Sequence, residues 1–239
     1  MEVILVIVVL GFVVAGMVFA YRQAEKRRAA LQAFAVNRGL SYTKDHDPAH
    51  DDRFARFGMF RRGHSRAALN TMEGTISIAE RSIRVRTGDF RFREQRGSGK
   101  NRRTVTVKFS YLIVWNPFGV GPETIVRREG IFDRLKGVLG FDDIDFESIE
   151  FSKAYHVSSD DKRFAYDLID PRMMEFIMST SPPAFEIDGE FICISDGKGR
   201  WDTEEFGRQL DWSGDFLDRW PRHLAKTMAD QAAVKRERT

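Results

Sequence analysis

The first hydrophobic pattern in the chain is an apolar run at its N-terminal end. Residues 3–20 contain sixteen hydrophobic residues and two glycines, and no charged side chain. Eighteen helical residues extend for about 27 Å, close to the ~30 Å hydrocarbon core of a bilayer. The run therefore predicts a membrane-spanning helix, a transmembrane anchor over residues 1–21.

A cleaved signal peptide is the alternative interpretation of this run. Such a peptide needs basic residues before its apolar core and a small-residue cleavage site after it. Only Met1 and Glu2 precede the run, and residues 18–22 offer no good cleavage site. We therefore expect an uncleaved anchor.

Basic residues follow the apolar run, and none precedes it: Arg22, Lys26, Arg27 and Arg28. Because cytoplasmic flanks of membrane helices carry the excess of Lys and Arg, the sequence predicts a single-pass protein of the cell membrane. Its N-terminus would lie outside and the rest of the chain in the cytoplasm. Helical spacing of apolar residues predicts that a basic juxtamembrane helix continues over residues 22–39.

The pattern then changes to a period of two residues. Residues 104–111 alternate strictly between polar and apolar side chains, which is typical of a strand with one buried face. The glycine-rich segment 96–101 predicts a turn, so a long hairpin joins residues 81–96 to this strand. Residues 185–194 indicate a second hairpin that turns at Asp188-Gly189.

Helical patterns occupy much of the C-terminal part. Asp160 or Asp161 is placed to cap one helix, Pro171 to begin another, and apolar residues recur at helical intervals over 206–224. The fold class is therefore α+β: one N-terminal transmembrane helix, then a mainly antiparallel β domain with C-terminal helices. This domain should cover residues 40–230, as one unit or as two subdomains that meet near 117–130. Residues 231–239 are expected to form a disordered tail.

Charge is unevenly distributed although the net charge is only +3. Residues 53–108 hold 15 Lys and Arg against 4 Asp and Glu, whereas residues 109–200 hold 10 against 17. The single cysteine excludes an intrachain disulfide framework, and therefore a small disulfide-stapled secreted protein.

The basic half suggests a surface for anionic ligands. If the apolar residues of the hairpin face the core, its cations should project from the other side: Arg84, Arg86, Arg91, Arg93, Lys100, Arg102 and Arg103. Such a surface could bind the phosphates of lipid headgroups. The alternatives are a solvated outer face of the sheet that resists edge pairing, and ion pairs with the acidic half of the same chain. Nucleic acid is unlikely as a partner, because no aromatic-interleaved RNA motif is present.

A short histidine and aspartate cluster is the first candidate metal site; residues 142–147 have the carboxylate density of a calcium loop but lack its glycine and ligand order. His46, His50 and Asp51 could gather a divalent ion. The alternative is a helix start, with Asp47 as the cap and Pro48 at the first helical position. No cofactor is predicted.

Several segments together resemble an uncharacterised family of mostly bacterial single-pass membrane proteins with a cytoplasmic α+β domain. The resemblance covers roughly residues 55–225 and depends on these positions: Gly63, Asn70, Met72, Gly74, residues 141–148, Phe151, Val157, Asp160, Asp161, residues 163–166 and residues 171–174. It implies the architecture but no activity, cofactor or catalytic residue.

The sequence therefore predicts a membrane-anchored binding module at the cytoplasmic face, whose partner is a protein or anionic lipid. A structural subunit of a larger envelope assembly is a third interpretation, which the sequence does not separate from the first. The alternative is a membrane-tethered enzyme of unknown reaction, with His46, His50 and nearby acidic residues as its only candidate constellation.

Overall fold

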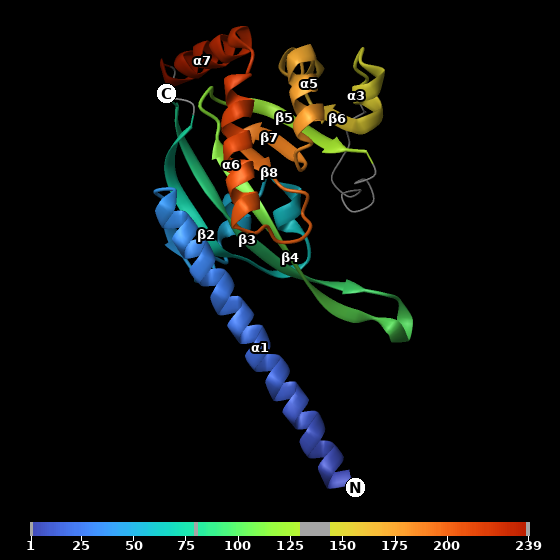
Figure 1. Ribbon diagram of the computed structural model, residues 1–239. Coiled ribbons are helices and arrows are strands. Elements are labelled where there is room, and N and C mark those ends of the chain that lie inside the picture. The colour runs from blue at the N-terminus through green and yellow to red at the C-terminus, as the bar shows by residue number, and fades with distance from the viewer. Residues whose placement is uncertain (1, 79–80, 130–143, 238–239) are drawn as a thin grey trace.

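One antiparallel sheet forms the centre of the protein (Figure 1). The computed structural model describes residues 2–78, 81–129 and 144–237. Eight strands pair in the order β1-β2-β3-β4-β8-β7-β5-β6. They are β1 (Ser41–Thr43), β2 (His64–Ile78), β3 (Arg81–Arg96), β4 (Arg103–Trp115), β5 (Gly121–Arg128), β6 (Tyr155–Ser159), β7 (Phe185–Gly189) and β8 (Phe191–Ile194).

The α+β class and the antiparallel sheet predicted from the sequence are confirmed. The long hairpin is β3 and β4, joined through a short 3-10 turn η2 (Gly99–Asn101). The second hairpin is β7 and β8, with Gly189 at φ +61° in its turn. Because β4 pairs with β8, one sheet runs across the segment 117–130 where two subdomains could have met.

Helices and short turns cover both faces of the sheet. The helices are α1 (Glu2–Asn37), α2 (His50–Arg53), α3 (Ile149–Ala154), α4 (Lys162–Leu168), α5 (Pro171–Thr180), α6 (Thr203–Asp218) and α7 (Arg222–Glu237), with a 3-10 turn η1 (Gly58–Arg61). The larger apolar core lies between the sheet and the C-terminal half of α1 with α3 to α7. A second, aromatic core lies on the opposite face beneath the segment 50–62.

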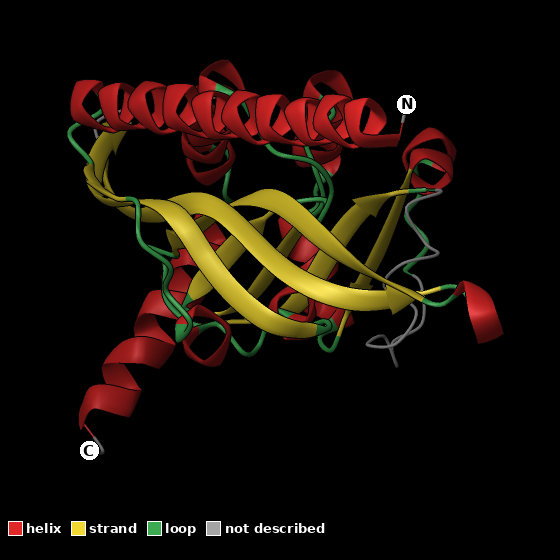
Figure 2. Ribbon diagram, turned by 90° about the horizontal axis from the view of Figure 1, so that it is seen from below, coloured by secondary structure: helices red, strands yellow, loops and turns green. Residues whose placement is uncertain are grey.

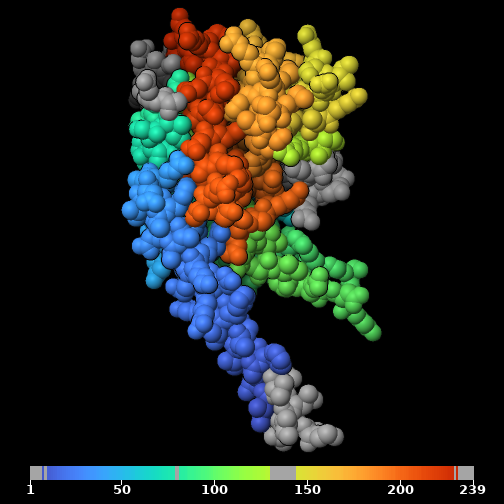
Figure 3. All heavy atoms as spheres, in the orientation of Figure 1, coloured from blue at the N-terminus to red at the C-terminus, as the bar shows by residue number. Residues whose placement is uncertain are grey.

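The first helix is longer than either of the two predicted segments. α1 runs without a break through both, and Gly39 follows its end at φ +69°. Leu31 and Ala35 are buried against the sheet, and Figure 2 shows α1 running along one side of it. The N-terminal half projects away from the domain (Figures 1 and 3), with Phe12 76% exposed.

The predicted membrane span over residues 3–20 is not supported. In the part of the chain that the structure describes, no helix has both the length and the apolar character that crossing a bilayer requires.

Two further expectations concern the C-terminal part. Asp161, not Asp160, caps α4 by accepting the Phe164 amide at 3.0 Å, and Pro171 begins α5 as predicted. α7 continues as far as Glu237, and the disordered tail expected from residue 231 stays a prediction. Residues 238–239 lie outside the described chain. So do residues 141–143, which belong to the segment 141–148 on which the family resemblance partly depends.

Candidate functional site

The arginines of β3 do not share one face of the sheet. Side chains alternate along a strand, and the register of β3 with β4 is unbroken over residues 85–96. Arg91 and Arg93 therefore lie on the face that α1 covers, whereas Arg84 and Arg86 lie on the opposite face. The predicted single basic surface is not formed.

Ion pairs occupy the two arginines on the face away from α1. Arg86 is only 8% exposed and reaches Asp47 at 2.6 Å and Glu73 at 2.5 Å. Arg84 reaches the same Glu73 at 2.9 Å and lies over the ring of Trp115, 4.2 Å from its centroid. Because their charges are already compensated, these two side chains hold the sheet together and offer little to an external anion.

The arm formed by β3 and β4 carries the cations that remain available. Arg93 is exposed, and Lys108 lies opposite Arg91 in the register of the two strands. At the tip, Lys100, Arg102 and Arg103 are all exposed. In the described chain, none of the tip residues has an ion pair, so the tip is a concentrated positive charge.

The base of the projecting half of α1 adds further positive charge. Arg22 and Lys26 are exposed, and His46 lies near both Arg28 and Arg91. Partial burial and then the positive charges of Arg91 and Arg28 lower the pKa of His46. Figure 1 shows that the arm and the projecting half of α1 leave the domain at the same end. We call the following residues the basic end: Arg22, Lys26, Arg28, Arg91, Arg93, Lys100, Arg102, Arg103 and Lys108.

A buried polar network fixes α1 relative to this arm. Arg27 donates from Nε and Nη2 to the two carboxylate oxygens of Asp89 on β3, at 3.0 and 2.6 Å. The Asp89 side chain is 1% exposed and also accepts from Asn70 at 2.9 Å and Ser110 at 2.7 Å. Asn70 has φ +51° within a register shift of β2, which turns its side chain toward Asp89.

The candidate metal ligands do not converge. His50 lies among the rings of Phe54, Phe60, Phe90 and Tyr111, and burial holds its pKa well below the ordinary value. Asp51 instead accepts from Arg66 at 2.6 Å, and His46 contacts Arg91 at 3.2 Å. Within residues 2–78, 81–129 and 144–237, no group of three or more His, Cys, Asp and Glu side chains is placed to hold a metal.

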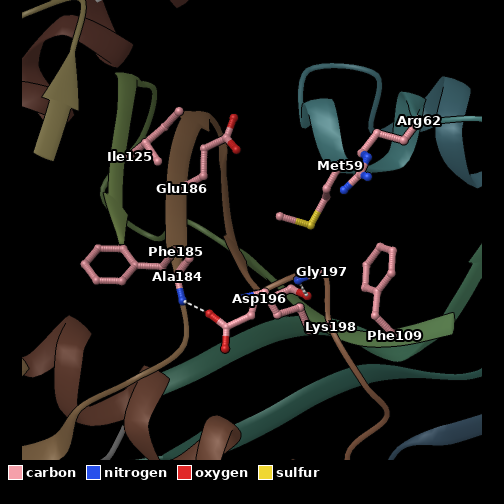
Figure 4. Close-up of a pocket in the computed structure, with 11 residues that line it drawn as sticks. Met59, Arg62, Phe109, Ile125, Ala184, Phe185, Glu186, Asp196, Gly197 and Lys198 are labelled. Carbon is pink, nitrogen blue, oxygen red and sulfur yellow. Dashed lines mark hydrogen bonds between the residues drawn. The ribbon is translucent and has the colours of Figure 1, made fainter. Parts of the chain in front are cut away.

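A small cavity lies beside the buried carboxyl of Glu186 on β7 (Figure 4). Met59 and Arg62 line it from the segment that covers the aromatic core. Burial, and then the negative charges of Glu123 and Asp188, raise the pKa of Glu186 to about 8. The cavity volume of about 30 Å³ suits a water molecule or two and no organic substrate. Glu186 was not among the residues predicted from the sequence, although it lies between the apolar residues Phe185 and Ile187 inside a predicted strand.

Comparisons with known proteins give one structural likeness. The chain matches no protein-family model and no curated protein. Its fold is similar to the crystal structure of the mycobacterial trehalose monomycolate transport factor A, TtfA, with a TM-score of 0.56 and 15% identity. The match covers 84% of this chain and 97% of that chain. At this identity the likeness shows the fold alone, and the family resemblance read from the sequence stays a prediction.

Proposed function

We propose that this protein is a binding module that works at an anionic membrane surface. The observation that carries the proposal is the common direction of two features, the apolar half of α1 and the basic end. Apolar side chains of α1 enter the lipid, and the cations of the arm contact headgroup phosphates.

The exposed apolar residues of α1 support the first half of this proposal. Leu10, Phe12, Met17 and Phe19 are each more than 60% exposed. Covering such a side chain contributes about 1.5–3 kcal/mol, so a helix that presents several of them gains from an apolar environment. Lipid supplies that environment on every side of the helix.

The uncompensated charge of the arm supports the second half. Each Lys or Arg held near an anionic leaflet contributes about 1 kcal/mol. Five cations of the arm, Arg93, Lys100, Arg102, Arg103 and Lys108, have no ion pair within the described chain. Their location on a projecting hairpin lets them reach a surface that the compact domain does not touch.

The enzyme alternative has less support from the geometry. Its candidate residues His46, His50 and Asp51 point to three different environments, and the cavity beside Glu186 is the size of water. The structural neighbour is named a transport factor, which is compatible with a binding role in this chain. We assign to this chain neither the cargo nor the partners of that transport factor.

Flotation with lipid vesicles tests the contribution of α1. The full chain should float with vesicles that contain phosphatidylglycerol, and a Phe12→Glu/Met17→Glu/Phe19→Glu variant should remain in the dense fraction. The control Arg163→Glu/Arg172→Glu/Arg222→Glu changes exposed residues of α4, α5 and α7, and should float normally. In a Glu2→Cys variant bound to vesicles, a cysteine that stays reactive to an impermeant maleimide would place the N-terminus on the same side of the bilayer as the domain. This result would contradict the predicted crossing of the membrane by α1.

The contact of the arm is tested separately, because α1 alone could hold the protein to vesicles. An environment-sensitive fluorophore on Ser98→Cys should be quenched by spin-labelled headgroups in anionic vesicles and not in neutral ones. Reversal of Lys100, Arg102 and Arg103 to Glu should abolish the quenching without changing flotation. Quenching that persists after this reversal, or that is equal in neutral vesicles, would refute the headgroup contact.

A further inference from the structure

A groove runs between α3, α4 and α5, at the end of the molecule opposite the projecting half of α1 (Figure 1). Its volume is about 1050 Å³, at the upper limit of the roughly 300–1,000 Å³ of ligand pockets. The floor is apolar and consists of Phe146, Ile169, Met174 and Met178. The groove is unrelated to the basic end and to the cavity beside Glu186.

Aromatic contacts hold the floor of the groove in place before any partner binds. Tyr166 donates from its hydroxyl to the backbone oxygen of Asp145 at 3.0 Å, and its ring meets that of Phe146 edge to face at 5.2 Å. Tyr166 is nevertheless 49% exposed, and the neighbouring Ile149 is 69% exposed. Apolar surface therefore continues from the floor onto the rim.

The rim is strongly acidic. Among the residues that the structure describes, no Lys, Arg or His lines the groove, whereas five carboxylates do: Asp145, Glu147, Glu150, Asp170 and Glu175. Asp170 caps α5 by accepting the Met173 amide at 2.8 Å. The other four are exposed, and none has an ion pair in the described chain. Their negative charge is therefore available to a partner.

We propose that this groove docks an amphipathic helix of a partner protein, one that presents an apolar stripe flanked by Lys and Arg. Helices bind in grooves between helices through apolar residues at i, i+3, i+4 and i+7. The flexible side chains of Met174 and Met178 adapt to such a stripe. The acidic rim selects a basic partner by charge complementarity.

The same features disfavour other occupants. An acidic rim repels anionic lipid, and the groove faces away from the end where α1 would meet a membrane. A bound metal ion would not need a floor of four apolar side chains. A second copy of this chain remains as the competing macromolecule, and the test includes it as an outcome.

Photo-crosslinking tests the proposal with the full chain in nanodiscs of neutral phosphatidylcholine. The probe is an 18-residue amphipathic helix of leucine and lysine with a central benzophenone, and a leucine–glutamate peptide is its control. We expect crosslinks from the lysine peptide that mass spectrometry locates within residues 145–179, and none from the glutamate peptide. The variant Glu147→Lys/Glu150→Lys/Glu175→Lys should weaken binding at least 10-fold.

Two matched variants separate the groove from general electrostatic attraction. Glu190→Lys/Glu204→Lys/Asp211→Lys makes the same charge change elsewhere on the surface and should alter binding less than twofold. Met174→Gln/Met178→Gln keeps every charge and should weaken binding about 5-fold. Equal losses in both charge variants, crosslinks scattered over the domain, or a dimer whose interface is this groove would each overturn the proposal. None of these results would bear on the membrane proposal, which depends on the other end of the molecule.

Discussion

Glu186 shows how burial of a single carboxyl ties stability to pH. Its pKa is about 8 in the folded protein and near 4.5 in an unfolded chain, because burial and two neighbouring acids disfavour its charge. Between these values the folded protein holds a proton that the unfolded chain releases. Stability should therefore fall as the pH rises from about 4.5 through 8.

The variant Glu186→Gln should lose this pH dependence. Since one pKa unit corresponds to about 1.4 kcal/mol, the variant should gain a few kcal/mol over the wild type between pH 5 and pH 8.5. Urea unfolding at the two pH values measures the difference. Glu190→Gln, at an exposed position of the same hairpin, should leave the pH profile unchanged. Parallel profiles for the wild type and Glu186→Gln would contradict the assignment.

For single residues, the sequence shows which side chains could bind a metal but not what surrounds them in the fold. His50 lies in a cluster of His and Asp that suggests a metal site, yet its ring packs among four aromatic rings that come from the C-cap of α2 and from η1, β3 and β4. Phe54 follows His50 by about one helical turn, but Phe90 and Tyr111 come from distant strands, so no local spacing could reveal the whole cluster. The neighbouring Asp51 forms an ion pair with Arg66, so its carboxylate is not free to bind a metal.

Among the elements, α1 is held to the sheet by a buried ion pair in addition to the packing of Leu31 and Ala35. Arg27 binds Asp89 with two hydrogen bonds and also donates to the backbone oxygen of Trp201 at 2.8 Å. Removing Arg27 leaves a buried carboxylate whose remaining side-chain donors, within the described residues, are Asn70 and Ser110. Loss of one partner of a buried pair costs about 3–5 kcal/mol.

We therefore expect Arg27→Met to destabilise the protein by about 3 kcal/mol and to loosen the C-terminal half of α1. Hydrogen exchange of residues 25–37 should accelerate, and denaturant unfolding gives the free-energy change. Arg28→Met removes an exposed pair with Glu25 on the same helix turn and should cost less than about 1 kcal/mol. If both variants lost the same stability and exchanged at the same rate, the buried pair of Arg27 with Asp89 would contribute no more to the docking of α1 than the exposed pair.

Element positions were largely predictable, whereas the face that each strand presents was not. The turn at 96–101 and the Asp188-Gly189 hairpin are local signals, and both are confirmed. Along β3, however, Ile83 and Phe90 are an odd number of residues apart, so they point to opposite faces. Both are buried because each face of this sheet is covered, one by the larger core and the other by the aromatic core. This sheet has two covered faces, which explains why the arginines of β3 are divided.

At the scale of the whole molecule, the continuous sheet couples the N-terminal and C-terminal halves. β4 and β8 join them through pairs such as Leu112 with Ile194, and the larger core contains residues from both halves. Phe90 belongs to the aromatic core, whereas Trp212 and Trp220 belong to the larger core on the opposite face. Phe90 does not contact either tryptophan. A change at Phe90 can therefore affect the unfolding that the tryptophans report only if the two cores unfold cooperatively.

Truncation of Phe90 should therefore lower the stability reported by the distant tryptophans. Phe90→Ala creates a cavity that costs about 3–5 kcal/mol, which corresponds to a melting temperature lower by about 10 °C. The measurement is thermal unfolding followed by fluorescence in a Trp115→Phe/Trp201→Phe background, where Trp212 and Trp220 remain. Phe12→Ala makes the same chemical change at an exposed position of α1 and should not shift the transition. If Phe90→Ala also left the melting temperature unchanged, the two halves would unfold as separate units. The pairing of β4 with β8 would then not couple their stabilities.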